Sequence, residues 1–251
     1  MSTDRAAVVD SRQLLVSGLR IATRVQGEGD PLLLINGMTR PLQSWDSLAR
    51  HLPGRTIISF DAPGVGASPT PLLPLSMPAL AALAVAVLDA TGVHDADVLG
   101  FSHGGAVAQQ LAADAPGRVR RLILVATSCG VGAIPGNGRA GLRGLGTPRA
   151  GNRWPYTDGV GMLWHSLAFA SWSSIPFLGS IRADTLVVSG SHDRVVPPAN
   201  SRVLARRIPG AALVVVPGGH DLQRPEAASR LARAVDDFLP AWTGAAAGTA
   251  G

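Results

Sequence analysis

The sequence predicts an α/β fold in which a mostly parallel central sheet is flanked by helices. Short apolar runs alternate with helical runs along most of the 251 residues, and the connections between them are short. Strand–helix–strand repetition of this kind implies right-handed crossovers and parallel strands. The run PLLLIN at 31–36 is apolar on both faces, which is typical of a strand inside such a sheet. Hydrophobic residues make up 46% of the chain and charged residues 16%, so a substantial core is available.

The elements of the first half follow from local composition and spacing. Apolar or β-rich runs predict strands at 19–25, 31–36, 55–60, 97–101 and 121–126. Between them, helices are expected at 44–51, 75–90 and 103–115. The second of these helices is rich in Ala and Leu, and Gly92 suits its C-terminal stop. The third follows its strand directly and ends near Pro116 and Gly117.

The same alternation returns in the second half of the chain. Strands are expected at 185–190 and 212–216, and helices at 199–207 and 225–239. We assign all of these elements to one domain at 13–240, with an N-terminal extension at 1–12 and a disordered tail at 241–251.

One segment, at about 130–181, interrupts the alternation and is interpreted as a small lid insertion. Its first part, 130–153, holds eight glycines and four arginines but no acidic residue, which is typical of a mobile loop. The stretch at 154–177 carries six of the eleven aromatic residues of the chain. These side chains could simply anchor an irregular segment, or they could fold over a site. We expect the second, with substrate contacts from Trp154, Trp164, His165 and Trp172.

The sharpest motif is Gly-Phe-Ser-His-Gly-Gly at 100–105, placed where a strand meets a helix. A Gly-x-Ser-x-Gly sequence in this position is typical of a nucleophile elbow, a strained turn that projects the serine hydroxyl above the sheet. Gly100 and Gly104 avoid steric clashes around the turn, and the amides that open the helix face the same point. Ser102 is therefore the candidate nucleophile.

A serine hydroxyl is a weak nucleophile, so a base and an acid that orients the base should follow it. Asp193 comes after the strand TLVVSG, and His220 comes after the strand ALVVVP. The chain order Ser102, Asp193, His220 is the order expected with an elbow of this type. Asp193 could instead cap a turn or a helix, and His220 could be an ordinary loop histidine. Because the three positions support one another, we expect a catalytic triad.

An acyl-transfer serine enzyme also needs backbone donors for the developing oxyanion. The strand PLLLIN ends in Asn36-Gly37-Met38, which places the Met38 amide where it can join the amide of His103. An ordinary turn is the alternative for this segment. The His103 side chain is expected to line the pocket beside the nucleophile.

Several other functions and sites are not supported. Apart from histidine, the basic residues are all arginines and are scattered, so the net charge of +5 does not indicate nucleic-acid binding. Gly64-Val65-Gly66 lacks the third glycine of a dinucleotide fingerprint, and metal-ligand spacing is missing, so neither a cofactor nor a metal is expected. Asp61 is interpreted as a turn or capping residue. The single cysteine, Cys129, excludes an intrachain disulfide.

The sequence also bears on location. Its apolar stretches are too short for a membrane span, and its first residues lack the pattern of a secretory signal, which favours a cytoplasmic protein. Arg149 and Arg153 flank the aromatic stretch and could rest on an anionic lipid or granule surface. An oligomeric state is not indicated.

From about Leu15 to Leu239 the chain resembles the α/β-hydrolase superfamily. The motifs that carry the resemblance are NGM, DAPGVGAS, GFSHGG, GSHDRVVP and GGHDL. The segments LLLINGM, FDAPGVGASPTPLLPLSMPALA, DVLGFSHGGAVAQQLA and SWSSIPFLGSIRADTLVVSG are most similar to intracellular medium-chain poly(3-hydroxyalkanoate) depolymerases. The resemblance implies an α/β-hydrolase fold and a serine esterase that cleaves 3-hydroxyacyl ester bonds in a storage polyester. It also implies that nucleophile, acid, base and the two oxyanion amides lie at Ser102, Asp193, His220, Met38 and His103.

Two features depart from that family. His103 follows the nucleophile where those depolymerases typically carry Trp, and the insertion at 130–181 is shorter and richer in Gly and Arg than their lid. Both features shape the acyl pocket, so they leave the triad intact, but the substrate can differ from that of the depolymerases.

We therefore predict a serine hydrolase that cleaves carboxylic esters of apolar (hydroxy)acyl substrates through an acyl-enzyme. An aromatic lid favours an apolar acyl group, because aromatic side chains offer contact area and few hydrogen bonds. The expected partner is an apolar acyl-ester small molecule or a polyester granule. The alternatives are a small-molecule esterase, lactonase or thioesterase with the same triad, and a non-catalytic ligand-binding protein on the same fold.

Overall fold

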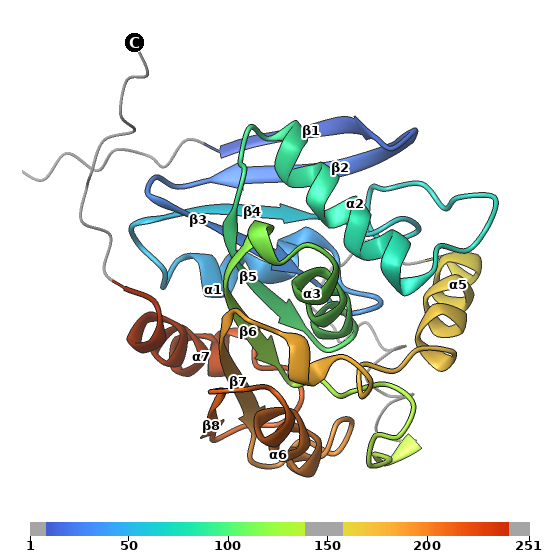
Figure 1. The fold of residues 1–251 in the computed structure, drawn as a ribbon. Helices are drawn as coiled ribbons and strands as arrows, with labels where there is room; N and C mark the ends of the chain where they lie inside the picture. The colour runs from blue at the N-terminus through green and yellow to red at the C-terminus, as the bar shows by residue number, and fades with distance from the viewer. Residues whose placement is uncertain (1–8, 139–157, 241–251) are drawn as a thin grey trace, which may run out of the picture.

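The structure is a computed structural model that describes residues 9–138 and 158–240, where an eight-stranded sheet lies between two layers of helices (Figure 1). The strands are β1 (Val9–Val16), β2 (Leu19–Gln26), β3 (Asp30–Ile35), β4 (Arg55–Phe60), β5 (Ala96–Phe101), β6 (Val119–Val125), β7 (Asp184–Gly190) and β8 (Ala212–Val216). Their order across the sheet is β1-β2-β4-β3-β5-β6-β7-β8. β2 pairs antiparallel with both β1 and β4, and every other neighbouring pair is parallel. The predicted α/β class with a mostly parallel sheet is confirmed.

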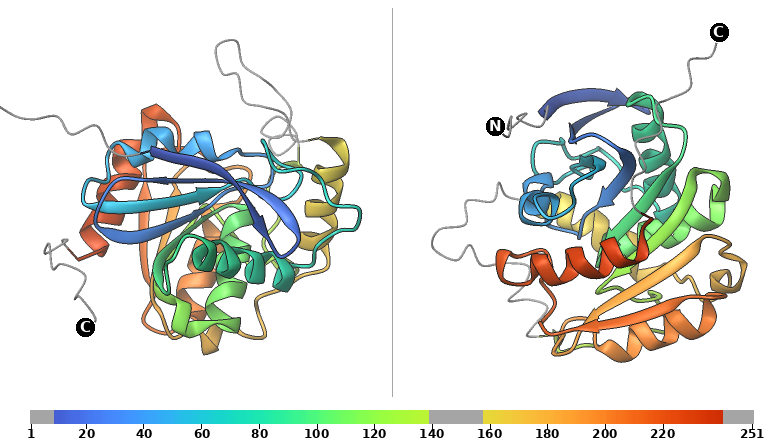
Figure 2. Two further views of the ribbon diagram at one scale, coloured as in Figure 1. Left: turned by 90° about the horizontal axis from the view of Figure 1, so that it is seen from above. Right: turned by 90° about the vertical axis from the view of Figure 1, so that its left-hand side faces the viewer.

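Helices cover both faces of this sheet (Figure 2). One face carries α2 (Met77–Ala90), α3 (His103–Asp114) and α6 (Pro198–Arg207), and the other carries α1 (Asp46–Ala49) and α7 (Pro225–Phe238). Short 3-10 helices lie in the connections: η1 (Leu42–Trp45), η2 (Pro116–Arg118) and η3 (Leu178–Ser180). A further helix of the described residues, α5 (Gly159–Ala170), belongs to the insertion and stands apart from the sheet at the side of the molecule (Figure 1).

The central strands are buried on both sides because a helix layer covers each face. In β3, Leu33 and Ile35 point into the hydrophobic cluster formed with α2 and α3. Leu32 and Leu34 point into the cluster formed with α1 and α7. This two-residue alternation explains why the strand sequence is apolar without a polar face.

The first strand of the sheet, β1, begins at Val9, within the segment 1–12 that the sequence predicts to be an N-terminal extension. The strand is exposed along most of its length, so it carries no buried stripe that periodicity could reveal. Its position comes from the ladder to β2, and positive φ values at Ser17 (51°) and Gly18 (77°) form the turn between the two strands. Such a turn is typical of a hairpin, so the Ser-Gly pair was the available signal.

The other predicted strands and helices are confirmed, with shifts of a few residues at their ends. The expected helix at 44–51 is divided into η1 and the single turn of α1. α2 begins at Met77, after a Ser76 hydroxyl that accepts from the Ala79 amide, and Gly92 follows its end with a φ of 75°. Caps of this kind, rather than composition, set where a helix begins and ends.

The insertion is attached to the sheet domain through α3. The Val131 amide donates to the Trp172 carbonyl at 2.8 Å, which joins the first part of the insertion to its last part. Gln109 of α3 donates to the Ser128 carbonyl at 3.1 Å and accepts from the Ser174 hydroxyl at 2.7 Å. One buried glutamine side chain therefore holds the segments that enter and leave the insertion.

Residues 139–153 of the expected mobile loop, with Arg149 and Arg153, lie outside the described residues, as does the predicted tail at 241–251. Within the part of the chain that the structure describes, no helix is long and apolar enough to cross a membrane.

Candidate active site

Four loops meet at the carboxyl ends of the parallel strands. β3 leads into the loop at 36–41, called here the Met38 loop, and β5 leads into Ser102. β7 leads into Asp193, and β8 leads into the loop at 217–224, called here the His220 loop. From the neighbours β3 and β5 the chain goes on to opposite sides, to β4 and to β6. Binding sites of α/β sheets form outside the strand ends at such a point.

Ser102 occupies a strained turn between β5 and α3. Its φ of 53° and ψ of −119° are unusual for a residue with a side chain. A Cβ on Gly100 would come 2.4 Å from the Gly104 carbonyl oxygen, and one on Gly104 would come 2.2 Å from the Ile35 carbonyl oxygen. The two glycines therefore let α3 begin directly against β5 and β3, which is the physical reason for the Gly-x-Ser-x-Gly spacing.

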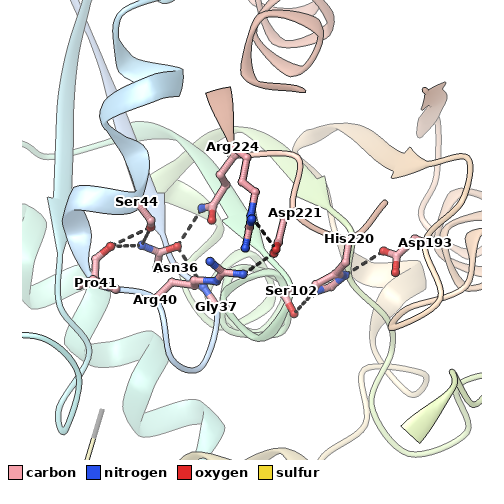
Figure 3. Close-up of polar contacts among 11 residues, drawn as sticks. Asn36, Gly37, Arg40, Pro41, Ser44, Ser102, Asp193, His220, Asp221 and Arg224 are labelled. Atoms are coloured by element: carbon pink, nitrogen blue, oxygen red, sulfur yellow. Dashed lines mark hydrogen bonds and ion pairs between the residues drawn. The ribbon is translucent and has the colours of Figure 1, made fainter. Parts of the chain in front are cut away.

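Ser102, His220 and Asp193 form one chain of hydrogen bonds (Figure 3). His220 Nε2 lies 3.0 Å from Ser102 Oγ, and His220 Nδ1 lies 2.8 Å from Asp193 Oδ2. An ionised carboxylate only accepts hydrogen bonds, so Nδ1 of the neutral imidazole carries the proton and Nε2 keeps its lone pair. An imidazole in this state can take the proton of a serine hydroxyl and so turn it into a nucleophile.

Asp193 is fixed by the turn that follows β7. Its side chain is 0% exposed, and Oδ1 accepts from the amides of Val195 and Val196 at 2.8 and 2.9 Å. A buried carboxylate requires such donors. The residue therefore caps its own turn with one oxygen and holds His220 with the other, so the two sequence interpretations of Asp193 are compatible.

The two amides expected to face the oxyanion belong to residues that line the same cavity as Ser102, namely Met38 and His103. His103 is the first residue of α3, so its amide has no acceptor within the helix. A Cβ on Gly37 would come 3.2 Å from the Phe101 ring and 3.5 Å from Ser102 Cβ. Glycine at this position therefore lets the Met38 loop pass close over the nucleophile.

A second polar network joins the Met38 loop to the His220 loop (Figure 3). Asn36 Oδ1 accepts from Gln223 Nε2 at 2.8 Å. The Arg40 guanidinium donates to the Asp221 carboxylate, which also pairs with Arg224 Nε at 3.0 Å. These contacts join residues 187 and 181 positions apart. The motifs NGM and GGHDL in the two loops do not indicate which side chains pair, so sequence reasoning missed these contacts.

Ser102 and His220 line a cavity of about 430 Å³. Its wall is largely apolar, with Ala133, Ile134, Pro135, Phe169, Val195 and Val196. Polar side chains are placed among them: Thr39, Arg40, Thr127, Ser128, Ser166 and Asn200. A cavity of this size and composition suits a small apolar group with a few polar atoms that fix its orientation.

The His103 side chain lines this cavity, as expected, and also contacts the insertion. Its ring centroid lies 5.1 Å from that of His165 and 6.0 Å from that of Phe169, both on α5. Burial lowers the pKa of His103 to about 3, and the charge of His165 acts in the same direction. Burial also lowers the pKa of His165, whose Nε2 donates to the Pro63 carbonyl at 2.9 Å. Both imidazoles are therefore neutral at pH 7 and join α5 to the turn of Ser102.

The tryptophans predicted to contact a substrate do not line the cavity where the structure describes them. Trp172 is buried and donates to Gln110 of α3 at 2.7 Å. Trp164 donates to the Pro71 carbonyl at 3.2 Å, which ties α5 to the loop before α2. Trp154 lies outside the described residues. The two described tryptophans thus anchor the insertion, which is the alternative that the sequence left open.

The side chains that α5 presents to the cavity are Ser166 and Phe169. His165 does not line the cavity and contacts it only through His103. Successive residues of a helix point about 100° apart, so one face alone can turn toward the cavity. α5 is apolar on most sides, so its sequence could not show which face that is.

Asp61 has the role of a turn or capping residue that the sequence predicts, and His192 also lies in loop structure. Asp61 is fully buried, its carboxylate accepts from the amides of Leu42 and Ala67 at 2.6 and 2.8 Å, and burial raises its pKa. His192 is exposed and bonds to the adjacent Ser191 hydroxyl at 2.8 Å. Among the residues of known placement, no group of three or more His, Cys, Asp and Glu side chains is arranged to hold a metal ion.

Comparison with known proteins gives a consistent result. A family model described as the alpha/beta hydrolase fold matches residues 30–141 and 147–226. The chain is similar to a poly(3-hydroxyalkanoate) depolymerase from Ectopseudomonas oleovorans, with 33% identity over 220 residues that cover 76% of this chain and 77% of that protein. It is also similar to a 2-hydroxymuconate semialdehyde hydrolase from Pseudomonas putida, with 32% identity over 265 residues that cover 91% and 93%. The solved structure of a hydrolase from Pseudomonas aeruginosa PA01 matches with a TM-score of 0.80 at 27% identity, covering 95% of this chain and 100% of that one.

Proposed function

Because the chain belongs to the α/β-hydrolase family, we propose that it hydrolyses carboxylic esters with Ser102 as nucleophile, His220 as general base and Asp193 as the orienting acid. The observation that carries this proposal is the hydrogen-bonded chain from Ser102 Oγ through His220 to the buried Asp193, at the wall of a cavity. The strained backbone of Ser102 supports it, because such strain persists where it serves a site.

In the first half of the reaction, Ser102 Oγ attacks the ester carbonyl carbon while its proton moves to His220 Nε2. The carbonyl π electrons move to oxygen, and the amides of Met38 and His103 stabilise the resulting oxyanion. When the tetrahedral intermediate collapses, the bond to the alcohol breaks and the alcohol takes the proton from His220. An ester between Ser102 and the acyl group remains.

In the second half, water attacks the acyl-enzyme and gives its proton to His220 Nε2. A second tetrahedral intermediate forms on the same two amides. Its collapse returns the proton to Ser102 Oγ and releases the carboxylic acid, so the net reaction is ester plus water to alcohol plus acid. Asp193 stabilises the imidazolium in both halves without being protonated itself.

We propose an apolar acyl or hydroxyacyl group as the part of the substrate that enters the cavity. Ile134, Phe169 and Val196 contribute to a largely apolar cavity wall, which suits such a group. The similarity to a poly(3-hydroxyalkanoate) depolymerase supports an ester of a hydroxyacyl group, either in a small molecule or at the end of a polyester chain.

The test is hydrolysis of p-nitrophenyl esters from acetate to dodecanoate by the wild type and by Ser102→Ala. We expect a maximum at medium chain length, and a loss of at least about a thousandfold in kcat for the variant, because the nucleophile and base act as one unit. Ser191→Ala is the matched control: this serine also bonds to a histidine, but on the exposed surface, and should keep full activity. Residual hydrolysis by Ser102→Ala above a few per cent would show that the mechanism is wrong.

A granule assay separates the polymer from soluble esters. Wild type and Ser102→Ala are incubated with medium-chain polyhydroxyalkanoate granules, and loss of turbidity is followed. Clearing that depends on Ser102 supports a depolymerase. Activity on soluble esters alone supports a small-molecule esterase, lactonase or thioesterase. The similarity to a 2-hydroxymuconate semialdehyde hydrolase, which covers 91% of this chain, favours a small-molecule substrate. A fluorophosphonate that fails to label Ser102 would instead support a non-catalytic binding protein.

A further inference from the structure

The Met38 loop and the His220 loop contact each other through side chains on the side of Ser102 opposite Asp193 (Figure 3). We propose that Asp221, paired with Arg40, and Gln223, bonded to Asn36, are positioning residues that fix the distance between the general base and the oxyanion amides. This inference rests on the proposed function, because it assigns the two loops to the two halves of that mechanism. We call the set of Asn36, Arg40, Asp221, Gln223 and Arg224 the loop clasp.

The first half of the loop clasp is buried and fully hydrogen-bonded at Asn36. Asn36 Nδ2 donates to the Pro41 carbonyl at 2.9 Å and to the Ser44 hydroxyl at 2.6 Å, which closes the Met38 loop on itself. Asn36 Oδ1 accepts from Gln223 Nε2 at 2.8 Å, which ties that loop to the His220 loop. Asn36 and Gln223 are 8% and 4% exposed, so water does not compete effectively for this bond.

The second half of the loop clasp consists of ion pairs, and its residues are close in sequence to His220 and Met38. Asp221 directly follows His220, and Arg40 comes two residues after Met38. The Asp221 carboxylate pairs with Arg40 and with Arg224, and its side chain is 25% exposed. A partly buried carboxylate between two guanidinium groups is held more firmly than a surface ion pair.

The His220 loop needs such a restraint because its own backbone is permissive. Gly218 and Gly219 precede His220, and Gly218 has a φ of 155°, so this part of the loop has little steric preference of its own. Asp193 fixes the imidazole from one side through Nδ1. The loop clasp fixes it from the other side, relative to the loop that carries the Met38 amide.

The consequence for rate follows from geometry. In the proposed transition state, His220 Nε2 and the Met38 amide must reach the reacting ester at the same time. A displacement of about 1 Å between such groups costs about a hundredfold in rate. Loss of the clasp should therefore lower kcat more than it raises KM, because it disturbs the transition state and leaves the apolar cavity unchanged.

The experiment is a double-mutant cycle with Arg40→Gln and Asp221→Asn, assayed on the best p-nitrophenyl ester. Asp221→Asn is the more informative variant: Asp221 does not line the cavity, whereas Arg40 does, so a change at Arg40 can also alter substrate binding. We expect Asp221→Asn to lower kcat about tenfold or more, with KM changed less than about twofold. The rate loss in the double variant should be smaller than the product of the two single losses, because both substitutions break the contact between Arg40 and Asp221.

The pair of Arg24 and Asp46 provides a matched control, since it is also an Arg–Asp hydrogen bond but lies away from the cavity. Arg24→Gln and Asp46→Asn should leave kcat unchanged. Thermal unfolding shows whether each variant is folded. If Asp221→Asn does not fold, Gln223→Met makes the same test from the buried half of the clasp, with nearly the same side-chain shape.

The proposal is overturned if folded Asp221→Asn, or Gln223→Met in its place, keeps kcat and the rate of fluorophosphonate labelling within about twofold of the wild type. A merely structural role would lower the unfolding temperature without changing either rate in the remaining folded protein. Ser102→Ala distinguishes the two proposals. If that variant stays active, the proposed function fails; if it is inactive and the clasp variants are not, only the present inference fails.

Discussion

At the scale of single residues, the neighbours Ser102 and His103 have different roles: Ser102 forms the strained turn, and the side chain of His103 contacts the insertion. Ser102 is held in its strained conformation by hydrogen bonds on both sides: its amide donates to the Val125 carbonyl at 2.9 Å, and its carbonyl accepts from the Thr127 hydroxyl at 2.7 Å. The ring of His103 makes a buried contact with the insertion. A buried neutral histidine makes folding sensitive to pH, and this sensitivity can be measured.

His103→Phe should flatten the acid limb of the stability curve. The unfolded chain binds a proton on His103 below a pKa of about 6.5, whereas the folded chain does so only below about 3. Stability is therefore lost as the pH falls from 6.5 toward 3. Urea denaturation at pH 7 and pH 5 should show about 2 kcal/mol less loss in the variant.

The control for this measurement is His51→Gln, because His51 is exposed. Its curve should superimpose on that of the wild type. Equal pH dependence in His103→Phe and wild type would show that the His103 imidazole is not held neutral by the fold.

At the scale of elements, the cavity wall depends on how α6 holds the insertion. Asn200 of α6 accepts from the Ile134 amide at 2.8 Å and donates to the Ile134 carbonyl at 2.9 Å. The Asn137 amide donates to the Arg194 carbonyl at 2.8 Å, beside Asp193. The segment that forms one wall of the cavity is thus attached to the elements that carry the site.

Asn200→Ala should change the acyl-chain preference more than the chemistry. The substitution removes two partly buried hydrogen bonds to Ile134, each worth about 1 kcal/mol, and so releases this part of the cavity wall. We expect KM for the preferred medium-chain ester to rise roughly three- to tenfold, while kcat for the acetate ester stays close to the wild type. The measurement is the chain-length profile with p-nitrophenyl esters.

Ser201→Ala is the comparison for that profile. Ser201 is the next residue of α6 and is equally buried, and its hydroxyl has no hydrogen-bond partner among the described residues. Its profile should match the wild type. If Asn200→Ala also matches it, the attachment at Ile134 does not shape the cavity.

At the scale of the whole molecule, the two ends of the parallel strands serve different purposes. The carboxyl ends carry the site, and the amino ends carry a buried ionic cluster. Asp97 at the start of β5 is 1% exposed and lies 3.6 Å from Arg55, 3.8 Å from Arg120 and 3.6 Å from Arg121. Arg55 also donates to the Pro240 carbonyl at 2.6 Å, which joins the end of the described chain to the sheet.

Asp97→Ala should destabilise the fold and leave the chemistry intact. Burial raises the pKa of Asp97 although three arginines surround it, so the carboxylate itself is not favourably placed. Its removal, however, leaves the buried Arg55 with one fewer counter-charge, which costs about 3 kcal/mol of unfolding free energy. Urea denaturation measures this loss, and kcat of the folded variant should be unchanged because Ser102 lies at the other end of β5.

Asp46→Ala is the comparison for the loss of unfolding free energy in Asp97→Ala. Asp46 pairs with Arg24 but is 46% exposed, so its removal should cost less than about 1 kcal/mol. If Asp97→Ala and Asp46→Ala lose the same free energy, the buried cluster contributes no more than a surface pair.

Much of the fold and of the candidate site could be predicted from the sequence. Most strands and helices show apolar periodicity or a composition typical of their type. The candidate site residues Ser102, Asp193 and His220 each follow a predicted strand, which indicates that they lie at the same edge of the sheet. The elbow at Ser102 is visible in the sequence because only Gly fits at 100, against α3, and at 104, against the end of β3. The chain order of Ser102, Asp193 and His220 followed from motifs that lie next to strands.

Other features depended on tertiary structure. β1 has no buried stripe, so only its pairing with β2 identifies it. The face that α5 turns to the cavity, with Phe169 in place of Trp164, is set by packing on His103 and on the loop before α2.

The α/β class, the order of elements and the residues of the candidate triad could therefore be predicted from the sequence, because local apolar patterns and short motifs beside strands indicate each of them. The cavity wall and the loop clasp were decided only by tertiary structure. Asp221 and Gln223 contact residues 181 and 187 positions away, and no local pattern specifies such a pair. Folding brings them together because β3 and β8 end at the same edge of one sheet.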